Sequence, residues 1–421
     1  MSKPGLLRVV GRWDLTAAVV NGVIGSAIFG LPSRVAALTG LWSPVAYLVT
    51  GVAVLGIALC FAEVASRFDE PGGPYLYVRE SLGRFVGFEA GWLFFCARVM
   101  TASAVLNVFA TYLAEFVPAA RAGFGRGVAM LGMLALATLP NLRGVRQATW
   151  SVNAFTIARL LPLALLLPAG VAHVRSEVLA SQAVAASDWP HAILLLVFAY
   201  VGFEAPLIPA SELRDPRRDT AFALLVGLGV VASVYMLVQV TVIGSVPHAA
   251  ASQAPLADAF RAVLGQPGAA LAGLAALISC FGWCLGSLLQ SPRLLYAMAE
   301  RGELPAVFAR VHECFRTPYV AILTYAAAAG ALALYGGFEW NASVGTVARL
   351  VTLGLTCVAL PVLRRTRPEA PGFRLPAAGV IVPAALGFCL WLLLTRSFEQ
   401  AWILALLVSC GAALFLAARR V

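Results

Sequence analysis

The strongest constraint on this sequence is a succession of apolar segments, each long enough to cross a lipid bilayer. A spanning helix needs roughly 20 mostly apolar residues, and about twelve such segments fit into the chain. They centre near residues 15–38, 42–65, 85–112, 124–140, 148–170, 190–210, 220–245, 268–291, 318–335, 342–363, 377–395 and 400–418. Charged residues make up only 12% of the chain, whereas they make up about a quarter of soluble domains. The sequence therefore predicts an all-α, multi-pass integral membrane protein without a separate soluble domain.

The basic residues indicate how the chain is oriented. If the amino terminus is cytoplasmic, 21 of the 30 Lys and Arg residues fall in cytoplasmic segments and five fall in outer loops. Cytoplasmic loops of membrane proteins are enriched in Lys and Arg. We therefore expect a protein of the cytoplasmic (inner) membrane with both termini inside and residues 1–14 as a cytoplasmic tail. The net charge of +10 follows from this topology, and nucleic acid is not expected as a partner.

Neither the cysteines nor the histidines indicate a metal site or a cofactor. The eight cysteines lie mostly inside the spans and form no Cys-x-x-Cys pair, which is typical of small packing residues. The four histidines fall in loops or at span ends. A membrane-embedded enzyme would need clustered ligands or acid–base groups. We therefore expect no metal, no cofactor and no enzymatic activity.

The first span is interrupted by polar and helix-breaking residues, Asn21-Gly-Val-Ile-Gly-Ser-Ala-Ile-Phe-Gly-Leu-Pro32. Glycine and proline weaken or end helices. Backbone that leaves the helix at membrane depth must be buried in protein or line a wet cavity. The second half of this helix is expected to begin near Ser26 to Phe29, with free amides suited to an anion such as a carboxylate. Close packing of two helices on small residues is an equally open interpretation.

The sixth span contains a second interruption, in which Gly202, Glu204, Pro206 and Pro209 follow Phe198. Each broken span is the first in a run of five spans. This pattern favours a transporter built from inverted repeats with its site between the broken helices. We expect a first five-helix repeat over residues 15–170, a second over 190–363, and two peripheral helices over 377–418.

Several charged residues lie within or beside the spans. A mid-membrane arginine is unfavourable unless it is paired or faces water. Arg98 is expected to meet Glu204, Glu89 or a substrate carboxylate, and Arg159 to be a fixed positive charge. Glu63 is either part of an inner gate or a solvated ion pair. Arg34 and Arg349 either reach an outer vestibule or extend their side chains to the outer surface, and the second is favoured for both.

The order of these motifs resembles that of bacterial amino acid permeases of the amino acid–polyamine–organocation superfamily. The resemblance rests on Gly25-Ser-Ala-Ile-Phe-Gly-Leu-Pro32, Ala62-Glu-Val-Ala-Ser-Arg-Phe-Asp-Glu-Pro-Gly-Gly-Pro-Tyr75, Asn153 to Pro162, Phe198-Ala-Tyr-Val-Gly-Phe-Glu204 and Glu212-Leu-Arg-Asp-Pro216. It implies a LeuT-type fold of about twelve transmembrane helices with two inverted five-helix repeats and discontinuous helices 1 and 6.

The resemblance also implies the residues of the binding site. The substrate carboxylate would meet backbone around Val23, Ser26 and Ala27, and the α-amino group would meet carbonyls at Phe198, Ala199 and Val201. Phe198 would close over the ligand as a gate. Gly25, Ile28 and Gly202 complete the set of expected binding residues.

The sequence departs from this family at two positions. Ala27 stands where members usually have a glycine, and its methyl group narrows the site. Arg159 stands where sodium-independent members usually have a lysine, so sodium coupling is disfavoured. Because arginine stays protonated, Glu204 and Glu63 are left as proton carriers, with proton-free exchange as the alternative.

These observations predict a sodium-independent secondary transporter for an amino acid or a related small amine, acting by alternating access. Proton coupling and exchange both remain open. Its expected partners are the small-molecule substrate, protons and the lipid bilayer, and it is expected to be a monomer or a homodimer. A transporter-like sensor that binds a ligand without net flux is the alternative.

Overall fold

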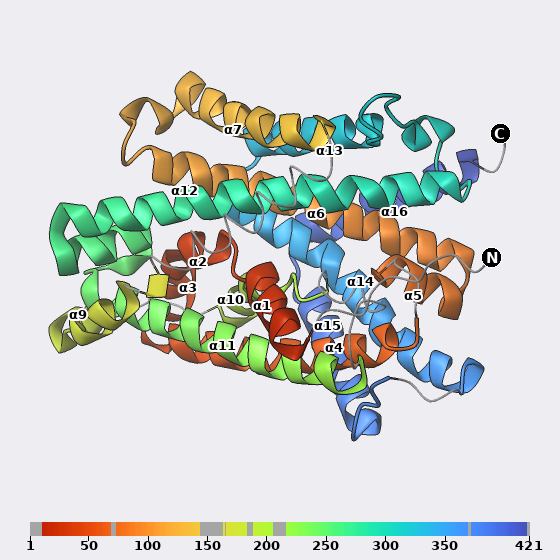
Figure 1. Ribbon diagram of the computed structural model, residues 1–421. Helices are drawn as coiled ribbons and strands as arrows, with labels where there is room; N and C mark the ends of the chain where they lie inside the picture. The colour runs from red at the N-terminus through yellow and green to blue at the C-terminus, as the bar shows by residue number, and fades with distance from the viewer. Residues whose placement is uncertain are drawn as a thin grey trace.

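A computed structural model describes residues 11–68, 73–143, 163–164, 166–182, 188–204, 216–368 and 372–418. Within these ranges the chain forms helices and short 3-10 turns and contains no strand (Figure 1). The helices are α1 (Arg12–Val23), α2 (Ala27–Gly30), α3 (Pro32–Thr39), α4 (Ser43–Ala65), α5 (Gly73–Leu82), α6 (Arg84–Leu113), α7 (Gly123–Arg143), α9 (Ser176–Ala180), α10 (Trp189–Tyr200), α11 (Pro216–Ser245), α12 (Pro255–Glu300), α13 (Tyr319–Tyr335), α14 (Phe338–Thr366), α15 (Ala378–Leu394) and α16 (Phe398–Ala418). The prediction of an all-helical fold is confirmed for the described part of the chain.

Many of these helices have the length and apolarity of membrane spans. Seven described helices are long and apolar enough to cross a bilayer, and α10, α13 and α15 are shorter apolar helices. Most of the segment expected at 148–170 lies outside the described residues. The integral membrane character is therefore confirmed, and the count of twelve spans stays a prediction.

The helices pack as a bundle with its short helices inside (Figure 1). In this view α7 and α13 run along one edge, and α4 and α11 run along the opposite edge. The short helices α1, α2, α3 and α10 lie between these edges. They are surrounded because α1 packs against α11, and α10 packs against α4 and α14.

Burial separates the central helices from the peripheral ones. The most apolar stretch of α6 is 89% buried, whereas that of α16 is only 11% buried. α6 packs against α5, α12, α13 and α14, which explains why apolar and small residues surround it on all sides. α16 instead exposes large side chains, among them Trp402 and Leu406, as expected of a helix that faces lipid.

Two buried carboxylates hold one end of the bundle together. Glu63, at the end of α4, accepts hydrogen bonds from Arg67 (2.7 Å), from Arg364 through two nitrogens (2.9 and 2.6 Å) and from the Leu375 amide (2.7 Å). Its side chain is fully buried. The ion pair of the second interpretation of Glu63 is therefore present, but it is buried and not solvated, and the role in an inner gate stays a prediction. The carboxylate ties α4 to α14 and to the segment that precedes α15.

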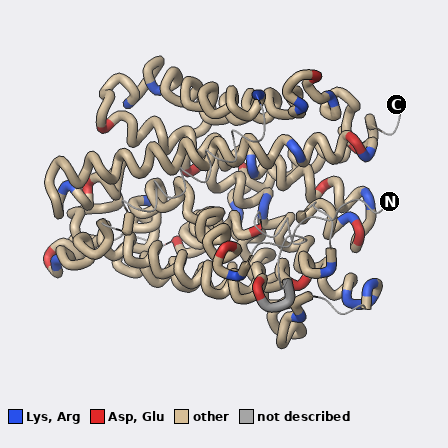
Figure 2. The backbone as a smooth tube through the Cα atoms, viewed as in Figure 1, with Lys and Arg blue, Asp and Glu red and all other residues tan. Residues whose placement is uncertain are grey.

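The second carboxylate, Glu303, follows α12 and is also fully buried. It accepts hydrogen bonds from the Tyr75 hydroxyl (2.6 Å) and from Arg79 (3.1 Å), both on α5. Burial and this hydrogen bond raise the pKa of the Tyr75 phenol above its ordinary value, so Tyr75 stays protonated and donates. Basic residues gather toward the end of the bundle that carries α5 (Figure 2).

Candidate functional site

The first helix is interrupted where the sequence predicts it. α1 ends at Val23, and Ile24 is extended, with φ −69° and ψ 99°. α2 begins at Ala27, and the Leu31 amide donates to the Ala27 carbonyl, so the helical path continues into α3. Gly25 and Ser26 lie between the two helices, and their amides donate to no backbone carbonyl in the described part of the chain. The interruption therefore leaves two donors free at the centre of the bundle.

The second interruption follows Tyr200, the last residue of α10. Val201 is extended, with ψ 153°, and Gly202 has a positive φ of 122°. A Cβ atom at Gly202 would lie 2.3 Å from the Gly22 carbonyl oxygen, so only glycine fits there. The prolines at 206 and 209, which also predicted this interruption, lie outside the described residues.

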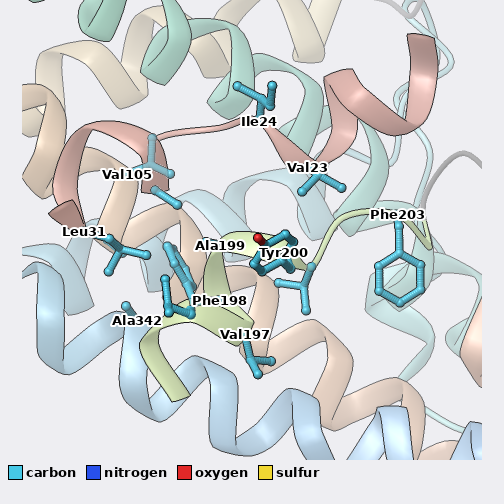
Figure 3. Packing of buried hydrophobic residues seen from close by; sticks show 14 of the residues in the cluster. Val23, Ile24, Leu31, Val105, Val197, Phe198, Ala199, Tyr200, Phe203 and Ala342 are labelled. Atoms are coloured by element: carbon cyan, nitrogen blue, oxygen red, sulfur yellow. The ribbon is translucent and has the colours of Figure 1, made fainter. Parts of the chain in front are cut away.

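The two interruptions are in direct contact. The Tyr235 hydroxyl, on α11, lies 3.0 Å from the Val23 carbonyl oxygen and 3.1 Å from the Ala199 carbonyl oxygen. One side chain thus caps the carbonyl ends of both α1 and α10. Figure 3 shows the link after Val23 and Ile24 passing beside the end of α10, where Ala199 and Tyr200 lie.

A cavity of about 20 Å³ lies between the two interruptions. Twelve residues line it: Gly22, Val23, Gly25, Ser26, Ala27, Arg98, Thr101, Phe198, Val201, Gly202, Trp283 and Arg349. This volume holds about one water molecule. The Trp283 ring closes part of the cavity, since a Cβ atom at Gly25 would lie 3.2 Å from its Cδ1 atom.

Arg98 enters the cavity from α6 and makes contacts that the sequence did not indicate. Its Nε donates a hydrogen bond to the Ser291 hydroxyl (3.1 Å), and its guanidinium lies 5.0 Å from the centre of the Trp283 ring. Among the described residues it pairs with neither Glu204 nor Glu89, so these two expected pairings are wrong. The sequence placed Arg98 at mid-membrane but could not show which helix face it occupies.

Arg349 enters the cavity from α14. The expectation that it extends to the outer surface is wrong, because its side chain is only 3% exposed and its Nη1 lies 3.6 Å from Glu204 Oε1. Glu204 Oε2 accepts a hydrogen bond from the Gly202 amide (2.8 Å). The side chain of Arg34, by contrast, is 44% exposed, and its Nε lies 3.6 Å from Glu339 Oε2.

The predicted binding and charge residues differ in where they lie, and Glu204 adjoins the cavity through Arg349 without lining it. Val23, Gly25, Ser26, Ala27, Phe198, Val201, Gly202 and Arg98 line the cavity. Ile28 and Ala199 are buried but do not line it, and Glu63 lies at the far network described above. Arg159 lies outside the described residues. The sequence reasoning missed Gly22, Thr101 and Trp283 as lining residues and misplaced Arg349.

A larger cavity lies on the other side of Arg98. It has a volume of about 430 Å³ and is lined by residues of α5, α6 and α12, among them Tyr75 and Phe94, and by Arg301, which follows α12. Arg98 lines both cavities. The lining of the larger cavity includes Pro74 and Tyr75 of α5 and Glu300 at the end of α12.

Comparisons with known proteins agree on one family. The family model described as "Amino acid permease" matches residues 10–415. A methylthioribose transporter of Bacillus subtilis (strain 168) is 28% identical over 423 residues, covering 92% of this chain and 88% of that protein. From the same organism, a branched-chain amino acid permease is 26% identical with the same coverage, and a serine/threonine exchanger is 27% identical over 76% of this chain and 74% of its own length.

Proposed function

The chain belongs to the amino acid permease family, and we propose that it is a secondary transporter that carries an amino acid or a related small amine by alternating access. The relatives are transporters and not enzymes, which agrees with the expectation from the sequence. The substrates in the names of these relatives differ, so family membership does not select one.

The observation that carries this proposal is the contact between two helix interruptions around a cavity. Free amides at Gly25 and Ser26 provide donors for a carboxylate. Carbonyls at the end of α10 provide acceptors for an amino group, at Phe198 and Val201. The Ala199 carbonyl is already hydrogen-bonded to Tyr235 and does not line the cavity, so it is a weaker candidate than the resemblance implied.

The size of the cavity supports a mechanism with two or more conformations. About 20 Å³ is too small for any amino acid, so the site has to open for binding. The cavity of about 430 Å³ beyond Arg98 is the proposed route to the cytoplasmic side. Movement of Arg98 and Trp283 would then join the two cavities.

The orientation and the repeats belong to the same proposal. We place the end that carries α5 in the cytoplasm, because Lys and Arg gather there, and both termini on that side. The interruptions after Val23 and Tyr200 would occupy equivalent places in two inverted five-helix repeats. α15 and α16 would be peripheral to both.

The proposed transport is independent of sodium and is driven by protons or by exchange. Arg159 supports this through its permanent positive charge, as argued from the sequence. Glu204 is the better placed of the two proton carriers, because it adjoins the cavity whereas Glu63 is held by four hydrogen bonds elsewhere.

Uptake into proteoliposomes tests the proposal. Purified protein should accumulate at least one of radiolabelled alanine, leucine, aspartate, asparagine or ornithine, either with a pH gradient or by exchange against the same compound inside. Replacing sodium by choline should leave the rate unchanged. Uptake that requires a sodium gradient and ignores pH would contradict the coupling, and tight binding without uptake or counterflow would favour a sensor.

A bulky substitution tests the site. Ser26→Trp fills the cavity and should abolish uptake, while the protein elutes as a folded species in size-exclusion chromatography. Ser233→Trp, at an exposed position of α11, is the matched control and should retain uptake. Unchanged uptake by Ser26→Trp would remove the cavity as the binding site.

A further inference from the structure

The charges at the cavity are unbalanced. Two arginines, Arg98 and Arg349, line it, and one carboxylate, Glu204, adjoins it. No Asp or Glu is among the described residues that line this cavity. An uncompensated charge away from bulk water is strongly unfavourable. The described site therefore carries one positive charge more than it neutralises.

The neighbours of Arg349 satisfy only part of its hydrogen-bonding capacity. Its Nη1 lies 3.6 Å from Glu204 Oε1, beyond normal hydrogen-bond distance. Its Nε and Nη2 atoms are buried and have no hydrogen-bond partner in the described structure. The guanidinium also lies 5.4 Å from the centre of the Phe94 ring, which offers no acceptor oxygen. A buried guanidinium with two free nitrogens at a cavity is arranged to bind an acceptor.

Glu204 is turned partly away from Arg349. Its Oε2 accepts from the Gly202 amide at 2.8 Å, and its Oε1 accepts no hydrogen bond within the described ranges. This carboxylate therefore stabilises the second helix interruption as well as facing Arg349. It does not occupy the remaining donors of the guanidinium.

Arg98 adds a second cation to the same cavity. Its Nε donates to Ser291, its guanidinium carbon lies 5.0 Å from the centre of the Trp283 ring, and the residue lines both cavities. Guanidinium groups bind carboxylates through paired, charge-assisted hydrogen bonds. Arg98 and Arg349 thus provide donors separate from the amides of Gly25 and Ser26.

We propose that Arg98 and Arg349 form a subsite for a second carboxylate, so that the substrate is an acidic amino acid with a net charge of −1. This inference rests on the proposed transport function and specifies its substrate class. The first carboxylate binds at the interruption of the first helix, and the second binds at the two arginines. A ligand of this charge neutralises the excess positive charge of the site, which a zwitterion would leave in place.

Acid and amide pairs of nearly equal size provide the test. Binding and uptake of L-aspartate and L-glutamate are compared with those of L-asparagine and L-glutamine, in proteoliposomes and by thermal shift of the purified protein. Hydrogen bonds to charged groups contribute roughly 1.5–3 kcal/mol, so the acids should bind roughly 10- to 100-fold more tightly. Equal or better binding of the amides overturns the proposal.

Substitutions of the two arginines test whether they cause the preference for acidic amino acids over their amides. Arg98→Gln should reduce the preference for the acid by at least roughly tenfold. The double variant Arg349→Gln/Glu204→Gln should also reduce the preference for the acid. It replaces both partners, so no unpaired buried carboxylate is left. Arg34→Gln, at the exposed pair with Glu339, is the matched control and should keep the wild-type preference. Retention of the preference in both cavity variants overturns the proposal.

A bound chloride ion is the other anion with this chemistry. Replacing chloride by gluconate should leave aspartate binding unchanged or strengthen it through loss of competition. If amides are carried as well as acids and their uptake requires chloride, the site binds chloride and the acidic substrate is wrong. Uptake of neutral amino acids alone contradicts the subsite but leaves the transport function intact, whereas absence of any uptake by folded protein contradicts the function itself.

Discussion

At the scale of single residues, the site depends on a glycine at a position where the Cβ atom of any other residue would collide with neighbouring backbone. Gly202 combines a φ of 122° with a contact to the Gly22 carbonyl oxygen. Both features require a residue without Cβ. The two interrupted helices can meet only because this residue is glycine.

Gly202→Ala should therefore destabilise the protein and prevent transport. The backbone conformation alone costs roughly 1–3 kcal/mol in a non-glycine residue, and the contact with Gly22 adds to this. Thermal unfolding in detergent and proteoliposome uptake measure the two effects. Gly229→Ala on α11 is the control, because a Cβ atom there meets nothing within 4 Å and alanine favours the helix. A melting temperature equal to that of the wild type for Gly202→Ala would contradict this account of the contact.

At the scale of elements, the structure is fixed by buried side chains that join helix ends distant in sequence. Tyr235 joins the ends of α1 and α10, and Glu63 joins α4 to α14. Backbone groups at an interrupted helix need such partners, because lipid offers none. The interruptions are thus supported from helices outside the site.

Glu63→Gln should weaken the junction of α4 and α14. It removes the charge that Arg67 and Arg364 share and should cost roughly 3 kcal/mol or more, because both arginines lose their partner. The thermal unfolding midpoint of the purified protein measures this loss. Arg365→Gln, at the exposed position beside Arg364, should change the midpoint little. Equal midpoints for Glu63→Gln and Arg365→Gln would show that the network contributes nothing to stability.

At the scale of the whole molecule, charge and burial vary along different directions. Basic residues gather toward one end of the bundle (Figure 2), whereas burial falls from α6 at the centre to α16 at the periphery. The first gradient orients the protein in the membrane. The second separates helices that contact protein from helices that contact lipid.

Cysteine labelling should report the orientation. Cys314 is exposed in the loop between α12 and α13, whereas six of the other seven cysteines are buried and Cys410 lies on α16. A membrane-impermeant maleimide should label Cys314 in inside-out vesicles and not in right-side-out vesicles. Ala119→Cys in a Cys314→Ser background, at the opposite end, should show the reverse pattern. Labelling of Cys314 from the outside would invert the proposed topology.

Several parts of the site could be predicted from the sequence because they depend on local chemistry. Glycine, proline and polar residues inside an apolar segment located the interruptions after Val23 and Tyr200. The resemblance to amino acid permeases then supplied Ser26, Phe198 and Gly202, all of which line the cavity. The sequence places Trp283 inside a predicted span, but no sequence pattern indicates that its side chain faces the cavity.

The sequence alone determined the membrane character, the helices and the depth at which two of them stop, because hydropathy and backbone preference act over short stretches of chain. Which charged residues meet depends instead on how the helices pack against one another. Arg349 lies in the middle third of α14, and the rotation of that helix turns it inward to Glu204 and the cavity. Helix rotation depends on packing against every neighbouring helix at once. The charge balance at the cavity is therefore a property of the folded bundle and not of any single segment.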